Sequence, residues 1–82
     1  MYLVKVHVAL KKGVLDPQGS TIQRSLAAMD FTGIEDVRVG KVFEIKIKGS
    51  SLEQVKDQVE QMCRKLLSNP VIEEYSFEVS EV

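Results

Sequence analysis

The sequence predicts a ferredoxin-like α+β fold, a two-layer sandwich in which two helices cover one face of a four-stranded antiparallel sheet. Two observations lead to this fold class. Apolar residues alternate with polar ones, as in strands, over residues 2–10, 37–47 and 71–79. Between these segments, residues 17–30 and 52–67 repeat apolar side chains at helical spacing. If the middle alternating segment folds back as a hairpin, the order of elements is β-α-β-β-α-β.

The first alternating segment reads as a half-buried strand. Its other face carries Lys5 and His7 between Leu3 and Ala9, so that face is expected to meet solvent. The strand ends at residues 11–13, Lys-Lys-Gly. The apolar positions that share one face are Tyr2, Val4, Val6, Val8 and Leu10.

Residues 16–19, Asp-Pro-Gln-Gly, fit both a type I turn and the start of a helix. In a helix, Asp16 would be the N-cap and Pro17 the first helical residue, where its missing N–H costs nothing. The apolar spacing that follows favours a helix from about residue 17 to 30. Glycine is unfavourable inside a helix, but this cost is smaller in the first turn, and the missing side chain of Gly19 lets another backbone come close. The residues at helical spacing are Ile22, Leu26 and Met29.

The middle segment carries its apolar side chains on positions of one parity. A three-residue loop over 40–42 would pair Val39 with Phe43 and keep these side chains on one face, whereas a two-residue loop would not. A single long strand bent at Gly40 preserves the same parity. The hairpin is the preferred interpretation. The residues concerned are Val37, Val39, Phe43, Ile45 and Ile47.

Ser50 or Ser51 is expected to cap the second helix, since Glu53 and Gln54 complete a capping box with them. Asn69-Pro70 stops this helix, and alternation resumes in a final strand over 71–79. The predicted apolar stripe of the helix consists of Leu52, Val55, Val59, Met62, Leu66 and Leu67.

The 82 residues form one predicted domain, 1–82, which is small enough to leave a thin margin of stability. Cys63 is the only cysteine, so no internal disulfide forms. Cys63 and His7 together are too few for a four-ligand metal site. A partner subunit is the remaining source of stability. The open sheet face suits a second copy or another subunit, because it places aliphatic residues among charges. These aliphatic residues are Leu3, Ala9, Val42 and Ile72.

The charge balance argues against several function classes. A formal net charge of −1 lacks the basic footprint of a nucleic-acid binder. No apolar run is long enough to span a membrane, and the first residues do not resemble a signal peptide. A lone thiol suits a reducing compartment, so a cytoplasmic location is expected.

Catalytic chemistry is not evident either. His7 lies on the polar side of a strand, and Cys63 lies at the edge of an apolar stripe, where a buried inert thiol is expected. Glu73 and Glu74 point to opposite faces of a strand, so they form no acid–base pair. No glycine-rich phosphate loop follows a strand. The sequence therefore predicts a protein without catalytic residues.

Three stretches resemble one family in combination: "LKKGVLDPQG" (10–19), "VRVGK" (37–41) and "CRKLLSNPVIEEY" (63–75). Together they are similar to PurS, the small subunit of phosphoribosylformylglycinamidine (FGAM) synthase, over nearly the whole chain. The resemblance implies the fourth step of de novo purine biosynthesis, in which formylglycinamide ribonucleotide is amidated with glutamine and ATP. It also implies that this subunit has no cofactor of its own, and that ATP and Mg belong to the synthetase partner.

The partners that the resemblance implies are a second copy of the chain, in a dimer or higher homo-oligomer, the PurL synthetase subunit and the PurQ glutaminase subunit. PurS is similar in role to an adaptor that bridges these two subunits and supports transfer of ammonia. Arg38 and Lys41 are favoured as contacts, since neither has an evident structural role. Carried over residue by residue, the candidates for partner contact are Asp16, Pro17, Gln18, Gly19, Arg38, Gly40, Lys41, Asn69 and Pro70.

Two other function classes are alternatives for a chain of this predicted fold. A dimeric small-molecule-sensing regulatory module has the same predicted fold, but such modules are usually attached to an enzyme or transporter. An RNA-recognition domain would need exposed aromatic residues on a basic sheet. Phe43 is the only aromatic residue in the central segment, and its parity directs it to the core.

Overall fold

The computed structural model describes all residues, 1–82. The element order is β1 (Tyr2–Leu10), α1 (Pro17–Ala28), β2 (Gly40–Ile47), α2 (Leu52–Met62), the π-helix η1 (Cys63–Leu67) and β3 (Glu73–Glu81). The three strands form one antiparallel sheet in the order β2-β1-β3. The α+β class is confirmed, but the prediction of a four-stranded sheet is wrong.

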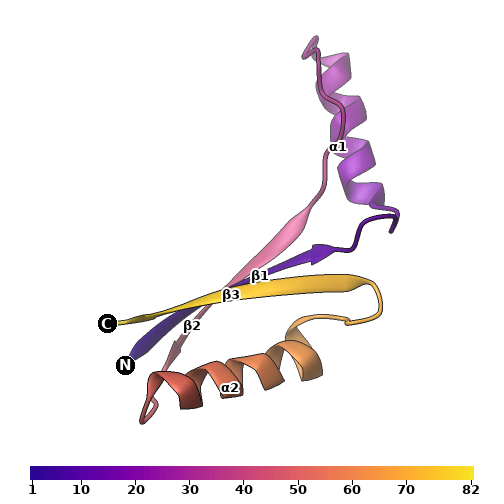
Figure 1. Cartoon of the computed structure of the whole chain (residues 1–82). Helices are drawn as coiled ribbons and strands as arrows, with labels where there is room; N and C mark the ends of the chain where they lie inside the picture. The colour runs from indigo at the N-terminus through magenta and orange to yellow at the C-terminus, as the bar shows by residue number, and fades with distance from the viewer.

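The missing strand is the first half of the predicted hairpin, which does not form. The chain turns at Asp30 and Gly33, both with positive φ, and then returns beside α1 (Figure 1). The Gln23 side-chain amide donates to the carbonyl oxygens of Ile34 and Glu35, at 3.2 and 3.1 Å. This segment is therefore tied to α1, and Phe43 pairs with Val6 of β1 instead of Val39.

The core lies between the sheet and α2. It consists of Val4, Val6 and Val8 from β1 and of Val55, Val59 and Cys63 from the helical segment, all nearly inaccessible to solvent. Ser51 caps α2 by accepting from the backbone N–H of Gln54, which confirms one of the two predicted caps. The predicted stripe is wrong at both ends, since Leu52 is 43 % exposed and Leu66 is 83 % exposed. At Leu66 the last turn widens into a π-helix, which changes the helical phase.

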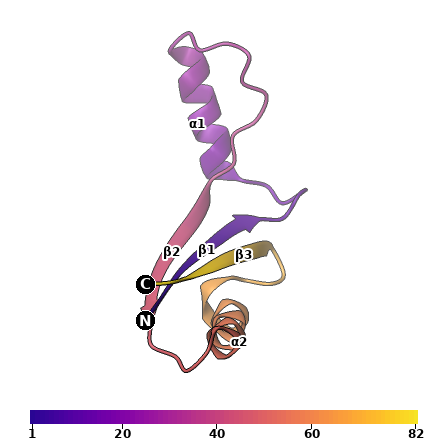
Figure 2. The same ribbon diagram turned by 60° about the vertical axis from the view of Figure 1, so that its left-hand side comes forward.

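Only α2 covers the sheet, so the prediction that two helices share one face is also wrong. Helix α1 projects away from the strands together with residues 29–39, and we call this unit the arm (Figure 2). The molecule consequently measures 51 × 28 × 15 Å. Ile22 and Met29, which the sequence assigned to a buried stripe, are exposed.

The other face of the sheet is open, as expected. On this face an ion pair joins Lys5 to Glu44 at 3.9 Å, and the His7 imidazole lies 3.6 Å from the carboxylate of Glu78. Val42 and Ile72 are exposed. Lys5 and Glu44 are directly opposite in the sheet register, and an exposed pair of this kind contributes little to stability.

Candidate partner-contact site at the base of the arm

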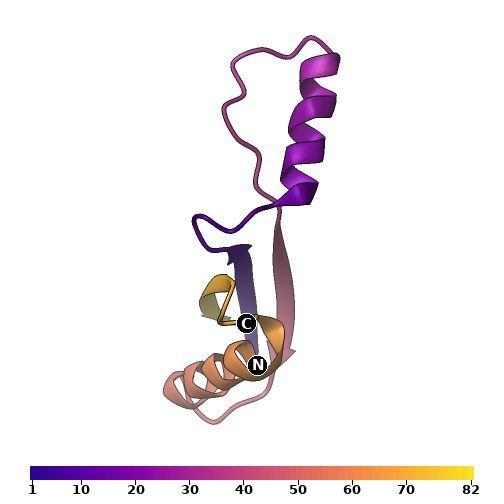
Figure 3. The ribbon, with the colours of Figure 1, turned by 90° about the vertical axis from the view of Figure 1, so that its right-hand side faces the viewer.

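The candidate contact residues come from three separate segments, and the structure brings all three together at the base of the arm (Figure 3). Here β1 ends, the arm leaves and returns, and the turn before β3 passes alongside. Asp16, Gln18, Gly40 and Lys41 line one hollow of about 220 Å³ together with Glu73. Sequence reasoning chose these residues by resemblance, and the fold supplies their common location.

Asp16 connects the two chain segments that cross the base. Its Oδ1 accepts from the backbone N–H of Gly19 at 2.8 Å, which confirms the predicted helix cap. Its Oδ2 accepts from the backbone N–H of Val39 at 2.7 Å. The bonds from Val39 and Gly19, with the charge of Arg38, hold the pKa of Asp16 below its usual value. Asp16 is only 5 % exposed, so its carboxylate is committed to the fold.

The two glycines of this region allow close approach of backbones. A Cβ on Gly19 would lie 1.9 Å from the carbonyl oxygen of Val37. A Cβ on Gly40 would lie 2.8 Å from the carbonyl oxygen of Val8. Both contacts are shorter than a side chain tolerates, so both positions require glycine for packing.

Lys11 is a third connection at the base, and the candidate set did not include it. Its ammonium donates to the carbonyl oxygen of Pro70 at 2.8 Å, and its backbone N–H donates to the carbonyl oxygen of Ile72 at 2.9 Å. Arg38 donates to the Lys11 carbonyl oxygen at 3.2 Å. The position of Lys11 in the first of the three motifs was the available signal. Because these acceptors are neutral, the side-chain charges of Lys11 and Arg38 stay available.

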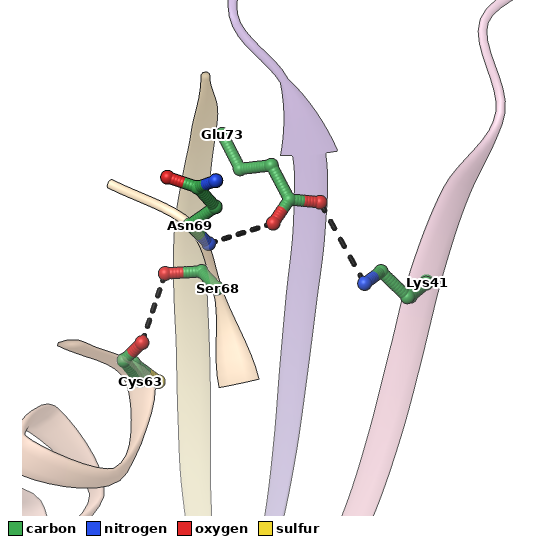
Figure 4. A network of polar contacts seen from close by, with 5 residues as sticks. All are labelled: Lys41, Cys63, Ser68, Asn69 and Glu73. Carbon is green, nitrogen blue, oxygen red and sulfur yellow. Dashed lines mark hydrogen bonds and ion pairs between the residues drawn. The ribbon is translucent and has the colours of Figure 1, made fainter. Parts of the chain in front are cut away.

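Lys41 and Asn69 meet through Glu73 (Figure 4). The Lys41 ammonium lies 3.7 Å from one carboxylate oxygen of Glu73, and the Asn69 backbone N–H donates to the other at 2.7 Å. Asn69 Oδ1 also accepts from the backbone N–H of Val71 at 3.1 Å. Ser68 donates to the Cys63 carbonyl oxygen at 2.9 Å and so ends the helical segment. Lys41 therefore has a structural partner that the sequence did not indicate.

The chemically reactive side chains lie elsewhere and apart from one another. His7 faces the open side of the sheet near a second hollow of about 500 Å³. Cys63 is buried on the α2 side, and burial raises the pKa of its thiol, with a smaller contribution from the charge of Glu60. No three His, Cys, Asp or Glu side chains are grouped as metal ligands would be. Neither helix has the length and apolar character needed to cross a membrane.

Comparison with known proteins gives one family throughout. The family model described as PurS, phosphoribosylformylglycinamidine (FGAM) synthase, matches residues 3–81. The chain is 50% identical over 82 residues to the phosphoribosylformylglycinamidine synthase subunit PurS of Bacillus subtilis, covering 100% of this chain and 96% of that protein.

Solved structures agree along the full length. The crystal structure of PurS from Methanocaldococcus jannaschii, one of the subunits of formylglycinamide ribonucleotide amidotransferase in the purine biosynthetic pathway, is 45% identical with a TM-score of 0.88, over 100% of this chain and 99% of that one. A chain in the structure of PurLQS from Thermotoga maritima is 28% identical with a TM-score of 0.86, over 98% and 99%. Because the matches span the whole chain, the projecting arm belongs to the shared fold.

Proposed function

The chain belongs to the PurS family of FGAM synthase subunits in purine biosynthesis, and from this premise we propose that it is the non-catalytic adaptor of the complex. In this role it bridges the PurQ glutaminase and the PurL synthetase, and it supports the glutamine-dependent, ATP-driven amidation of formylglycinamide ribonucleotide. The relative in Thermotoga maritima occurs in a structure described as PurLQS, which supports the same partners here.

The separation of the reactive side chains supports a non-catalytic role. His7 contacts Glu78 on the open face, whereas Cys63 is fully buried beneath the opposite face. A nucleophile and its base must lie within hydrogen-bond distance of one another. Since these two residues lie on opposite faces of the sheet, the chemistry is assigned to the partners. In this proposal ATP and Mg bind the synthetase. The proposed location of the complex is the cytoplasm.

The observation that carries the adaptor role is the extended shape. The arm projects from the sheet (Figure 1). Its side chains Ile22, Met29 and Phe31 are exposed. At its base, polar and charged residues of three motifs lie together around Lys41 and Arg38. Apolar surfaces that fold away from their own core are typical of interaction surfaces. We propose that the nine candidate residues at the base support partner contact. Asp16, Gly19 and Gly40 do so by shaping the fold, and the other six by touching the partner.

A second copy of the chain is the proposed occupant of the apolar side of the arm. The spacing of Ile22, Leu26 and Met29 is that of a helix that packs on a sheet. The arm is held away from its own sheet, where Phe43 and Ile45 remain only partly buried beside α2. A reciprocal exchange, with each arm on the sheet of the other copy, would bury both surfaces in one symmetric dimer.

The test is the rate of formylglycinamide ribonucleotide amidation by the synthetase and glutaminase subunits of the same organism, with and without this chain. Glutamine is the nitrogen donor in one series and ammonia in a matched series. The adaptor role predicts that glutamine-dependent turnover requires the chain and that ammonia-dependent turnover depends on it much less. Equal rates with and without the chain in both series would disprove the proposal.

A further inference from the structure

The arm is joined to the rest of the molecule only at its base. The extensive contacts between elements join β1 to β2, β1 to β3 and α2 to η1, and none of them involves α1 (Figure 3). The chain enters the arm through residues 11–16, where Gly13 has a positive φ, and leaves it directly into β2. Within one chain, the direction of the arm is therefore determined by contacts at this crossing.

One carboxylate makes the closest contacts there. Asp16 accepts from Gly19 in the first turn of α1 and from Val39, the residue before β2, through different oxygens. These two donors come from segments that are far apart in sequence. Hydrogen bonds to a charged acceptor are about twice as strong as neutral ones. Asp16 thus ties the beginning of the arm to its end.

Gly19 makes this tie possible. The carbonyl oxygen of Val37 occupies the space that a Cβ at position 19 would fill. Further along, Gln23 bonds the carbonyl oxygens of Ile34 and Glu35, so α1 and the returning segment form one unit. Because its two segments are bonded to each other and meet the rest of the chain at the base, a change in the direction of the arm requires a change at that base.

We propose that Asp16, Gly19 and Val39 form a clamp that fixes the direction of the arm relative to the sheet. This inference rests on the adaptor function, because the direction of the arm would set the distance between the two catalytic partners. Loosening the clamp is expected to lower glutamine-dependent turnover while the sheet and α2 stay folded. Turnover with ammonia from solution does not require the two partners to be held at a fixed distance.

The decisive variant is Asp16→Asn. Asparagine caps helices as well as aspartate does, but it offers only one oxygen, so the bond from Gly19 is kept and that from Val39 is lost. The matched control is Ser51→Ala, which removes the cap of α2 far from the arm. A second variant, Gly19→Ala, favours helix formation but forces Val37 away. Intrinsic helicity therefore predicts slower amide exchange in the arm, whereas loss of the clamp predicts faster exchange.

Two measurements are made on each variant. Amide hydrogen exchange of the free chain is expected to be about tenfold faster over residues 17–39 in Asp16→Asn and Gly19→Ala, with β1 unchanged. In Ser51→Ala, only α2 should exchange faster. In the complex, the ratio of glutamine-dependent to ammonia-dependent turnover is expected to fall severalfold for the first two variants and to stay at the wild-type value for Ser51→Ala.

Unchanged exchange in the arm of Asp16→Asn, or slower exchange in Gly19→Ala, would overturn the clamp whatever the complex does. Faster exchange with an unchanged turnover ratio would overturn its role in spacing the partners and leave the adaptor function intact. If the wild-type chain itself has no effect on glutamine-dependent turnover, the adaptor function fails, and the spacing role fails with it.

Discussion

At the scale of single residues, Asp16 combines a local and a distant role. The local role, capping α1, follows from the order Asp-Pro-Gln-Gly and was predicted. The distant role, accepting from Val39, depends on a contact between positions that are 23 residues apart. A capping rule describes neighbours in sequence, so it does not indicate from which distant N–H the second carboxylate oxygen accepts a hydrogen bond.

Asp16 also makes stability depend on pH in a defined direction. Its folded pKa is lowered by the backbone bonds from Val39 and Gly19, whereas the unfolded chain has the ordinary value of about 3.9. The stabilisation is therefore fully present above that value and is lost as pH falls through the lowered folded pKa. Wild type and Asp16→Asn should differ in free energy of unfolding at pH 7, and the difference should begin to shrink below about pH 4 and vanish only below the lowered folded pKa. Denaturant titrations at several pH values measure this, and a constant difference would contradict it.

At the scale of elements, the helical stripe of the second helix was predicted correctly in its centre and wrongly at its end. Val59 is fully buried, whereas Leu66 is 83 % exposed. Val59→Ala should lower the free energy of unfolding by about 2 kcal/mol, because two buried methyl groups are lost and a cavity remains. Leu66→Ala should change it by less than about 0.5 kcal/mol. Urea unfolding of both variants is the measurement, and equal losses would contradict the packing described here.

The attachment of α2 to β3 involves a polar contact that the sequence did not indicate. The Tyr75 hydroxyl donates to Glu60 Oε1, which also lies 3.2 Å from the Arg64 guanidinium. The bond to Glu60 raises the pKa of Tyr75, although Arg64 acts in the opposite direction. Tyr75→Phe is expected to lower Tm by about 5 °C. Tyr2→Phe is the control, since Tyr2 packs beside the same core without a side-chain hydrogen bond, and its Tm should not change.

Two helices and three strands could be predicted from the sequence, but the predicted strand over 37–39 is wrong, because the neighbour of this segment could not be predicted. Residues 37–47 have the same parity whether they form a hairpin or continue in one direction. Periodicity reports which face a side chain occupies, and it does not report what that face packs against. Gln23 and Asp16 decide the outcome by bonding the returning segment to α1. The candidate site was predicted as a set of residues, while its location at the base required the fold.

At the scale of the whole molecule, the exposed arm predicts self-association. Wild-type chain should sediment as a dimer or larger species at micromolar concentration. Ile22→Glu places a charge in the apolar side of the arm and should shift the protein toward monomer by at least tenfold in dissociation constant. Ala28→Glu, an exposed position on another side of the same helix, should leave the distribution unchanged. Equal sedimentation of the two variants would show that the arm is not the contact.

The projecting arm has a further consequence for how the reach of such a subunit can change. Helix α1 and the returning segment meet at a turn, with positive φ at Asp30 and Gly33, at the end of the arm that points away from the strands (Figure 1). One additional helical turn, matched by about two residues in the extended segment, would move the tip outward by about 5.4 Å. The sheet, α2 and the base of the arm would not be disturbed. Insertions at the tip would thus alter the span of the protein in discrete steps, independently of its folding.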